Sequence, residues 1–245
     1  MHVRLSQLAR ERDDLDAAMQ HVLTSHELGE HNGLPQNPYR WRVAMARIRE
    51  AEGDLNGALD LLDEAERRFT SDFGPNVRPI GAMKARVFVR QGRLAEALAW
   101  AQTRHVSAED ELNYVREFEH ITLARLLLAM GSPSEALALL DRVLLAAQEG
   151  GRTGSVIEIL VLTAVAHHQR GRAPAALVPL ERAVMLAQPE GYVRMFVDEG
   201  PPVAALLQAA AKHGIAPGYV RRLLIAFCPA GRQSAVESGL DGAAE

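Results

Sequence analysis

Three arginines recur at a constant spacing in this sequence, and their side chains suit the binding of anions. Arg47, Arg86 and Arg125 lie 39 residues apart. A guanidinium is a planar, permanently charged donor that matches the geometry of a carboxylate or a phosphate group. We therefore expect these residues, the ladder arginines, to contact an effector that carries a carboxylate or a phosphate, or an acidic peptide.

Pairing inside the protein is the alternative role for the same arginines. Arg47 has Glu50 three residues away on the same predicted helix, whereas Arg86 and Arg125 have no carboxylate at a neighbouring helical position. Carboxylates on other helices would then be the partners, for example those of Glu119 and Glu158. The sequence leaves ligand binding and structural pairing both open.

Histidines are numerous enough to suggest a metal site, but their spacing is unfavourable. His21, His26 and His31 follow one another in steps of five, and each step turns a helix by about 140°. Zinc-binding histidines on one helix commonly lie four residues apart. His167 and His168 are adjacent, so they diverge by about 100°. We expect no metal site.

Catalytic motifs are not found either. The single cysteine, Cys228, follows the last predicted helix, and no serine lies in a G-x-S-x-G elbow. The acidic groups Asp13–Asp14 and Glu109–Glu111 fall where we predict that helices begin, and negative charge there offsets the helix dipole. We predict that the chain is not an enzyme.

Composition indicates a helical protein without a nucleic-acid surface. Hydrophobic residues make up 48% of the 245 residues and aromatic residues only 5%, which favours helices over strands. The net charge of −4 speaks against a general nucleic-acid surface. One cysteine cannot form an intrachain disulfide, and no long apolar run or leader is evident. We therefore expect a cytoplasmic protein.

An alanine that recurs every 39 or 40 residues indicates the helices that would position the arginines. A short phrase with a glycine, a polar turn and a Leu-x-x-Ala pair surrounds it, as in GDLNGAL at Gly53–Leu59 and GRLAEAL at Gly92–Leu98. The marker alanines are Ala18, Ala58, Ala97, Ala136 and Ala176. Repetition at this period indicates a stacked array of helical hairpins.

The residue types in this phrase suit the end of one helix and the start of the next. The glycines occupy the place where a helix C-terminus commonly needs a left-handed residue, and Asp13 replaces glycine in the first copy. Asp54 and Ser132 are suitable N-caps for the next helix, and Pro133 and Pro174 suit its first turn. A small marker alanine allows two helices to approach closely.

A second series of alanines lies twelve residues before the markers, at Ala46, Ala85, Ala124 and Ala164. The paired pattern resembles tetratricopeptide repeats, although each unit is five or six residues longer than the usual 34. We place the extra length in longer helices or in loops at 32–38, 72–79 and 105–109. A period near 40 also overlaps the HEAT class. In a tetratricopeptide fold the ladder arginines lie on the concave face.

The end of the repeat region carries the most specific likeness to a family. The segment GYVRMFVDEGPP at Gly191–Pro202, followed by IAPGYV at Ile215–Val220, resembles the end of the repeat region in MalT-like, ATP-dependent LuxR-type transcription activators. LARERDDLDAAMQHV at Leu8–Val22 is similar to the start of that region, so the resemblance covers roughly residues 1–228.

This resemblance implies a regulator with an N-terminal ATPase, a helical sensor and a C-terminal helix-turn-helix, of which this chain is the sensor. The two lysines, Lys84 and Lys212, lack the glycines of a P-loop, so we expect ATP only in a domain outside this chain and no cofactor within it. We take the chain as a fragment. It divides into a repeat array at 1–189, capping helices at 190–228 and a flexible linker at 229–245 toward a DNA-binding domain.

The predicted fold is all-α, a right-handed superhelical array of about five hairpins with a helical cap. The predicted function, implied by the resemblance, is an effector-sensing and interaction module. A small-molecule or peptide effector binds its concave face and controls self-association of the full regulator. Partners are the other domains of the regulator, with no direct contact to nucleic acid or membrane. The alternative is a scaffold that recruits another protein and has no small-molecule effector.

Overall fold

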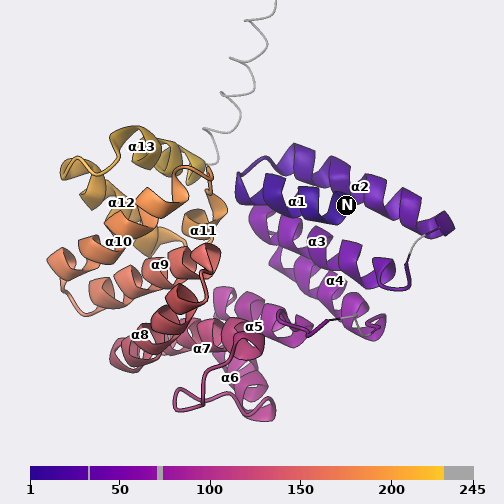
Figure 1. Cartoon of the computed structure of the whole chain (residues 1–245), viewed down its shortest axis with the longest axis horizontal. Coiled ribbons are helices and arrows are strands. Elements are labelled where there is room, and N and C mark those ends of the chain that lie inside the picture. Colours follow the sequence, from indigo (N-terminus) through magenta and orange to yellow (C-terminus); the bar gives the residue numbers. More distant parts are fainter. Residues whose placement is uncertain (33, 71–73, 229–245) are drawn as a thin grey trace, which may run out of the picture. The chain divides into compact units, whose positions relative to one another are not determined.

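The computed structural model describes residues 1–32, 34–70 and 74–228, and all regular elements among them are helices (Figure 1). The chain forms two compact units, Met1–Ser155 and Val156–Glu245. The first unit contains α1 (His2–Glu11), α2 (Leu15–Asn32), α3 (Asn37–Glu52), α4 (Leu55–Arg67), α5 (Ile80–Arg90), α6 (Leu94–Thr103), η1 (Tyr114–Arg116), α7 (Glu117–Ala129) and α8 (Pro133–Glu149). The unit boundary lies within α9 (Thr153–Gln169), which is followed by α10 (Ala173–Ala187), α11 (Arg194–Val197), α12 (Pro201–Lys212) and α13 (Pro217–Ala226).

Antiparallel hairpins build the first unit. The pairs α1 with α2, α3 with α4, α5 with α6 and α7 with α8 pack against each other. Helices α2, α4 and α6 also pack on the first helix of the next pair. In addition, α1 contacts α3, and α5 contacts α7. This order of contacts is that of a tetratricopeptide-like array, which confirms the all-α repeat fold predicted from the sequence.

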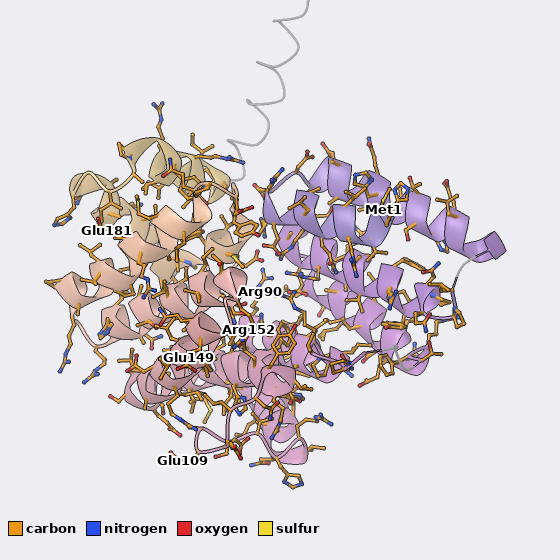
Figure 2. The ribbon with its side chains drawn as sticks, viewed as in Figure 1. Met1, Arg90, Glu109, Glu149, Arg152 and Glu181 are labelled. Atoms are coloured by element: carbon orange, nitrogen blue, oxygen red, sulfur yellow. The ribbon has the colours of Figure 1, made fainter. Side chains whose placement is uncertain are left out.

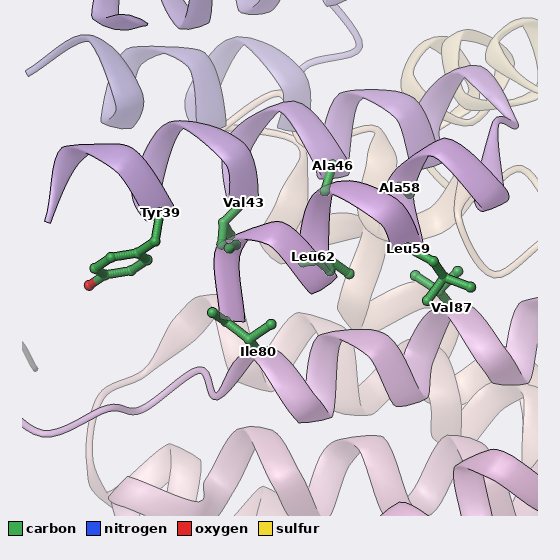
Figure 3. Packing of buried hydrophobic residues seen from close by; sticks show 9 residues of the cluster. Tyr39, Val43, Ala46, Ala58, Leu59, Leu62, Ile80 and Val87 are labelled. Atoms are coloured by element: carbon green, nitrogen blue, oxygen red, sulfur yellow. The ribbon is translucent and has the colours of Figure 1, made fainter. Parts of the chain in front are cut away.

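Both alanine series lie where helices meet. The five marker alanines, and Ala46, Ala85, Ala124 and Ala164 of the second series, all have side chains that are 0% exposed. Figure 3 shows one such contact region, where Ala46 on α3 and Ala58 on α4 lie among larger side chains such as Leu62. Small residues are therefore required because the helix axes come close together at these points.

The turns inside the hairpins also follow the sequence prediction. Gly53, Gly92, Gly131 and Gly171 have positive φ angles between 69° and 91°. Asp13 adopts the same left-handed conformation, with φ of 64°. An aspartate tolerates this conformation better than most residues that carry a Cβ atom, so the first hairpin keeps its turn without a glycine.

Helix starts agree with the prediction in part. Asp54 caps α4, because its Oδ1 accepts a hydrogen bond of 2.9 Å from the amide of Gly57. Pro133 and Pro174 lie in the first turns of their helices. Ser132 occupies the N-cap position of α8, as predicted, but its side chain makes no capping hydrogen bond.

The connections between hairpins differ from the predicted loops in length. Helix α2 extends to Asn32, so it covers the start of the loop expected at 32–38. The connection expected at 105–109 is longer, because no regular element lies between Thr103 and Tyr114. The predicted loop at 72–79 falls partly outside the described residues.

Three short helices follow α10 in the second unit. Helix α12 packs on α10, and α11 and α13 pack on α12 and on each other. Phe196 is 0% exposed and lies edge-on to Tyr219 with 6.4 Å between ring centroids, while the Tyr219 hydroxyl donates to the carbonyl of Tyr192. The predicted linker at 229–245 lies outside the described residues, and the predicted division at 189 stays a prediction.

Candidate functional site

Arg47 lies on α3, next to the fully buried Ala46. Its Nη2 atom donates to Oε1 of Glu11 at 2.8 Å, and Nη1 of Arg10 contacts the same oxygen at 3.0 Å. The ion pair of Arg47 is thus with the end of α1 and not with Glu50. Two guanidiniums therefore share one oxygen of the Glu11 carboxylate.

The charges around Arg47 act on its own ionisation. Burial is the main cause that lowers the pKa of Arg47, and the positive charges of Arg10 and Arg78 lower it further. The carboxylates of Glu11 and Glu50 act in the opposite direction. Desolvation and repulsion therefore outweigh the two carboxylates and disfavour the charged form of Arg47.

Arg86 projects from α5 onto α7. Its Nε atom donates to Oγ1 of Thr122 at 2.8 Å, and its Cζ atom lies 3.6 Å from the centroid of the Phe118 ring. Thr122 in turn donates to the carbonyl of Phe118 at 2.7 Å. The ring and the hydroxyl therefore fix the plane of the guanidinium from two sides.

Arg78 belongs to the same site, although the sequence analysis did not identify it. It is exposed, and its Cζ atom lies 5.5 Å from the centroid of the Phe118 ring that Arg86 also contacts. Its charge also reaches Arg47. Arg78 lies in the connection before α5 and has no counterpart in the repeat, so periodicity could not reveal it. The one local signal in the sequence was the position of Arg78 directly before Pro79, next to the start of a predicted helix.

Arg125 is half-buried on α7, three residues after Thr122. The ladder arginines thus come from α3, α5 and α7, which are the first helices of successive hairpins. We call Arg47, Arg78, Arg86 and Arg125, together with Phe118, the arginine face. Arg78 and Arg86 share the Phe118 ring, and the charge of Arg78 acts on Arg47. A guanidinium held beside an aromatic ring has the geometry that suits a planar anion.

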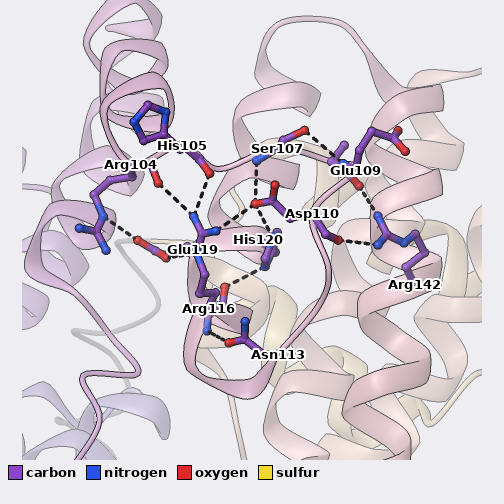
Figure 4. Close-up of polar contacts among 11 residues, drawn as sticks. Arg104, His105, Ser107, Glu109, Asp110, Asn113, Arg116, Glu119, His120 and Arg142 are labelled. Atoms are coloured by element: carbon purple, nitrogen blue, oxygen red, sulfur yellow. Dashed lines mark hydrogen bonds and ion pairs between the residues drawn. The ribbon is translucent and has the colours of Figure 1, made fainter.

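A second polar cluster organises the connection between α6 and α7 (Figure 4). Arg116 is its centre. The Nε of Arg116 donates to Oε2 of Glu119 at 3.0 Å, and its Nη1 donates to Oδ2 of Asp110 at 3.1 Å. Its Nη2 donates to the carbonyl oxygens of Arg104 and His105, each at 3.1 Å. One side chain therefore holds both ends of the 104–116 loop.

Asp110 has a role other than the predicted one. It lies in the 104–116 loop and not at a helix start, and it accepts hydrogen bonds from Ser107 and Arg116. The fully buried His120 contacts it at 3.3 Å through Nε2. Asp14 does lie at a helix start, because its Oδ1 accepts from the amide of Ala17 at 3.0 Å.

The histidines considered for metal binding have other surroundings. His21 lies against His2 with 5.5 Å between ring centroids, and the ring of His26 lies 4.3 Å from that of Trp41. The side chain of His31 lies outside the described residues. Among the side chains that are described, no group of three histidine, cysteine, aspartate or glutamate residues is placed to hold a metal ion.

Comparison with known proteins agrees with the fold and the repeat pattern. The model of the family described as the MalT-like TPR region matches residues 1–213. No curated protein matches the chain. Within the described part of the chain, no helix combines the length and the hydropathy needed to span a membrane. Since the family match covers most of the 245 residues, the chain belongs to the MalT-like TPR region family.

Proposed function

We propose that this chain is the effector-sensing module of a LuxR-type transcription regulator, and that an anionic effector binds its arginine face. The family to which the chain belongs fits a regulatory sensing and interaction region. Helical repeat arrays ordinarily bind partners through extended surfaces and do not catalyse reactions. The chemistry of the proposed effector comes from the arginine face itself.

One observation carries the proposal. The half-buried Arg47 shares the Glu11 carboxylate with Arg10, and its pKa is lowered by desolvation and by the positive charges of Arg10 and Arg78. Keeping the guanidiniums of Arg10, Arg47 and Arg78 close together costs folding free energy, compared with uncharged side chains at the same positions. A carboxylate or phosphate on the arginine face would offset that repulsion.

The proposed mechanism follows from the position of the ladder arginines on successive hairpins. An anion that contacts α3, α5 and α7 together stabilises one arrangement of these helices over others. Self-association of the full regulator would respond if the favoured arrangement exposes a different surface, because a ligand shifts an equilibrium by its differential affinity for the two states.

A thermal-shift screen of the chain with citrate, inorganic phosphate, adenosine monophosphate and a glutamate-rich peptide tests effector binding. A ligand at 100 times its dissociation constant adds about 2.7 kcal/mol of stability. We expect at least one of these anions to raise the melting temperature, and the shift to shrink as salt screens the charges.

The matched variants are Arg78→Gln and Arg93→Gln. Arg93 is also an exposed arginine over an aromatic ring, with its Cζ 4.6 Å from the centroid of Phe88, but it lies at the start of α6. We expect Arg78→Gln to weaken binding of the anion and Arg93→Gln to leave it unchanged. Equal affinities in the two variants would contradict the proposed site. A stoichiometric protein partner, with no response to any anion, would instead support the scaffold.

A further inference from the structure

A pocket of about 210 Å³ lies beside the 104–116 loop, within the first compact unit. Its walls come from the end of that loop, from the start of α7 and from the C-terminal half of α8. The lining residues are Leu112, Asn113, Tyr114, Glu117, Val143, Ala146, Glu149 and Arg152. None of the arginines of the arginine face lines it, so this pocket is a separate feature of the molecule.

An ion pair that is already satisfied forms one side of the pocket. Nε of Arg152 donates to Oε2 of Glu117 at 2.7 Å, and Oγ of Ser155 donates to Oε1 of the same carboxylate at 2.6 Å. Nη2 of Arg152 also donates to the carbonyl of Ala146 at 2.7 Å. Arg152 folds closely over Gly150, where an added Cβ would lie 1.6 Å from Nη1. The charges of Arg152 and Glu117 therefore neutralise each other in a fixed geometry.

Glu149 supplies a charge that is not neutralised. It is exposed at the end of α8, and it makes no ion pair with any residue that the structure describes. Figure 2 labels both Glu149 and Arg152, which are close in sequence on either side of the turn between α8 and α9. With two carboxylates and one guanidinium, the lining has a net negative charge.

Tyr114 offers an aromatic ring at the same pocket. Its side chain is 54% exposed, and Cζ of Arg152 lies 5.4 Å from the ring centroid. A ring that already attracts one cation can attract a second on its open surface, because both faces carry the negative part of the ring quadrupole. Leu112, Val143 and Ala146 add apolar surface.

The loop that carries Tyr114 is held in place before any ligand arrives. Oδ1 of Asn113 accepts a hydrogen bond from the amide of Arg116 at 3.1 Å and caps η1. Arg142 on α8 donates to the carbonyl oxygens of Ala108 and Asp110. The bonds of Arg142 tie the loop to α8, and the bond of Arg116 to Glu119 ties it to α7. The loop is therefore already ordered, and a ligand would not have to order it on binding.

We propose that this pocket binds a small organic cation, namely a primary ammonium group on a short apolar body. The ammonium pairs with Glu149 and lies against the open surface of Tyr114, while the apolar body contacts Leu112, Val143 and Ala146. The volume is below the 300–1,000 Å³ that is typical of sites for drug-sized ligands, so the ligand is smaller than these.

Titration of the chain with 2-phenylethylammonium chloride tests the proposal. We expect saturable binding by calorimetry, together with shifts of the amide resonances of residues 112–117. The uncharged 2-phenylethanol and the anionic 3-phenylpropanoate have a similar apolar body and should bind at least about tenfold more weakly, since a charged hydrogen bond contributes roughly 1.5–3 kcal/mol. Absence of binding at millimolar concentrations, or equal binding of the alcohol, would overturn the proposal.

Variants separate this site from general attraction of cations. Glu149→Gln should weaken binding about tenfold or more, and Tyr114→Leu should weaken it about threefold to tenfold. Glu135→Gln is the matched control, because Glu135 is an exposed glutamate in the first turn of the same helix. If Glu135→Gln lowers the affinity as much as Glu149→Gln, the pocket is not the site. Circular dichroism verifies the fold of each variant, and Arg78→Gln should leave binding of this cation unchanged.

Discussion

Arg86 and Thr122 join the first helices of two successive hairpins through a hydrogen bond of 2.8 Å. The arginine lies on α5, and the threonine is fully buried on α7. Thr122 also donates to the carbonyl of Phe118, so its hydroxyl serves as donor and acceptor at once. This bond orients a charged group on the arginine face and at the same time connects two repeats.

Thr122→Val should therefore lower the free energy of unfolding more than the same substitution at a threonine whose hydroxyl bonds only within its own helix. The isosteric valine leaves Nε of Arg86 without its acceptor, at a cost of about 1–3 kcal/mol in the free energy of unfolding. Thr163→Val is the control, because Thr163 is also buried and donates to the carbonyl four residues earlier, at 2.9 Å. Urea unfolding measures both variants. Equal losses would show that the contact with Arg86 adds nothing.

Ala97→Leu should overpack the contact between α5 and α6. Ala97 is 0% exposed, and extra methylene groups in a packed interior typically cost about 1–3 kcal/mol. Ala99→Leu on the same helix is exposed and should change the free energy of unfolding by less than about 0.5 kcal/mol. Chemical denaturation compares the two. A stable Ala97→Leu variant would contradict the role assigned to the marker alanines.

His120 should make the stability of the protein depend on pH. Burial lowers the pKa of His120 below its usual value of 6.5, and Arg116 lowers it as well, although the hydrogen bond to Asp110 acts in the opposite direction. The unfolded chain then binds a proton before the folded chain does. Stability contributed by neutral His120 is complete above about pH 6.5 and is lost as the pH falls through the lower folded pKa.

The measurement is the melting temperature between pH 7.5 and 5 for the wild type, His120→Gln and His213→Gln. His213 contacts the carbonyl four residues earlier, as His120 does, but it is exposed. We expect His120→Gln to flatten the decline below pH 6.5 and His213→Gln to keep it. An unchanged profile in His120→Gln would assign the decline to other groups. Asp110, whose pKa is also lowered, acts in the same direction at more acidic pH.

Gly171→Ala should destabilise the turn between α9 and α10. Nothing lies within 4 Å of the added Cβ, but φ is +69°, where an L-residue is strained by about 1–2 kcal/mol. Gly218→Ala in the first turn of α13 also meets open space and has no positive φ, so it should be neutral or stabilising by up to about 1 kcal/mol. Thermal unfolding distinguishes the two variants. Similar effects would contradict a requirement for left-handed backbone at Gly171.

The repeat architecture could be predicted from the sequence because it depends on local rules that return with each unit. A turn needs a residue that tolerates positive φ, so the glycines and Asp13 indicate the turns of the hairpins. Helices that pack closely need small side chains, so the alanines indicate where the helices meet. The last predicted segment, 229–245, falls outside the described residues.

The partners of the charged residues were decided by the tertiary structure. Arg47 pairs with Glu11, 36 residues earlier, although Glu50 is closer in sequence, and Arg86 contacts Thr122, 36 residues later. Arg78 and the pocket around Tyr114 lie in or beside connections that the repeat does not specify. Local sequence determines helices and turns, because those depend on backbone conformation. Contacts between long side chains depend on how helices from different repeats are brought together, and only the folded chain sets that distance.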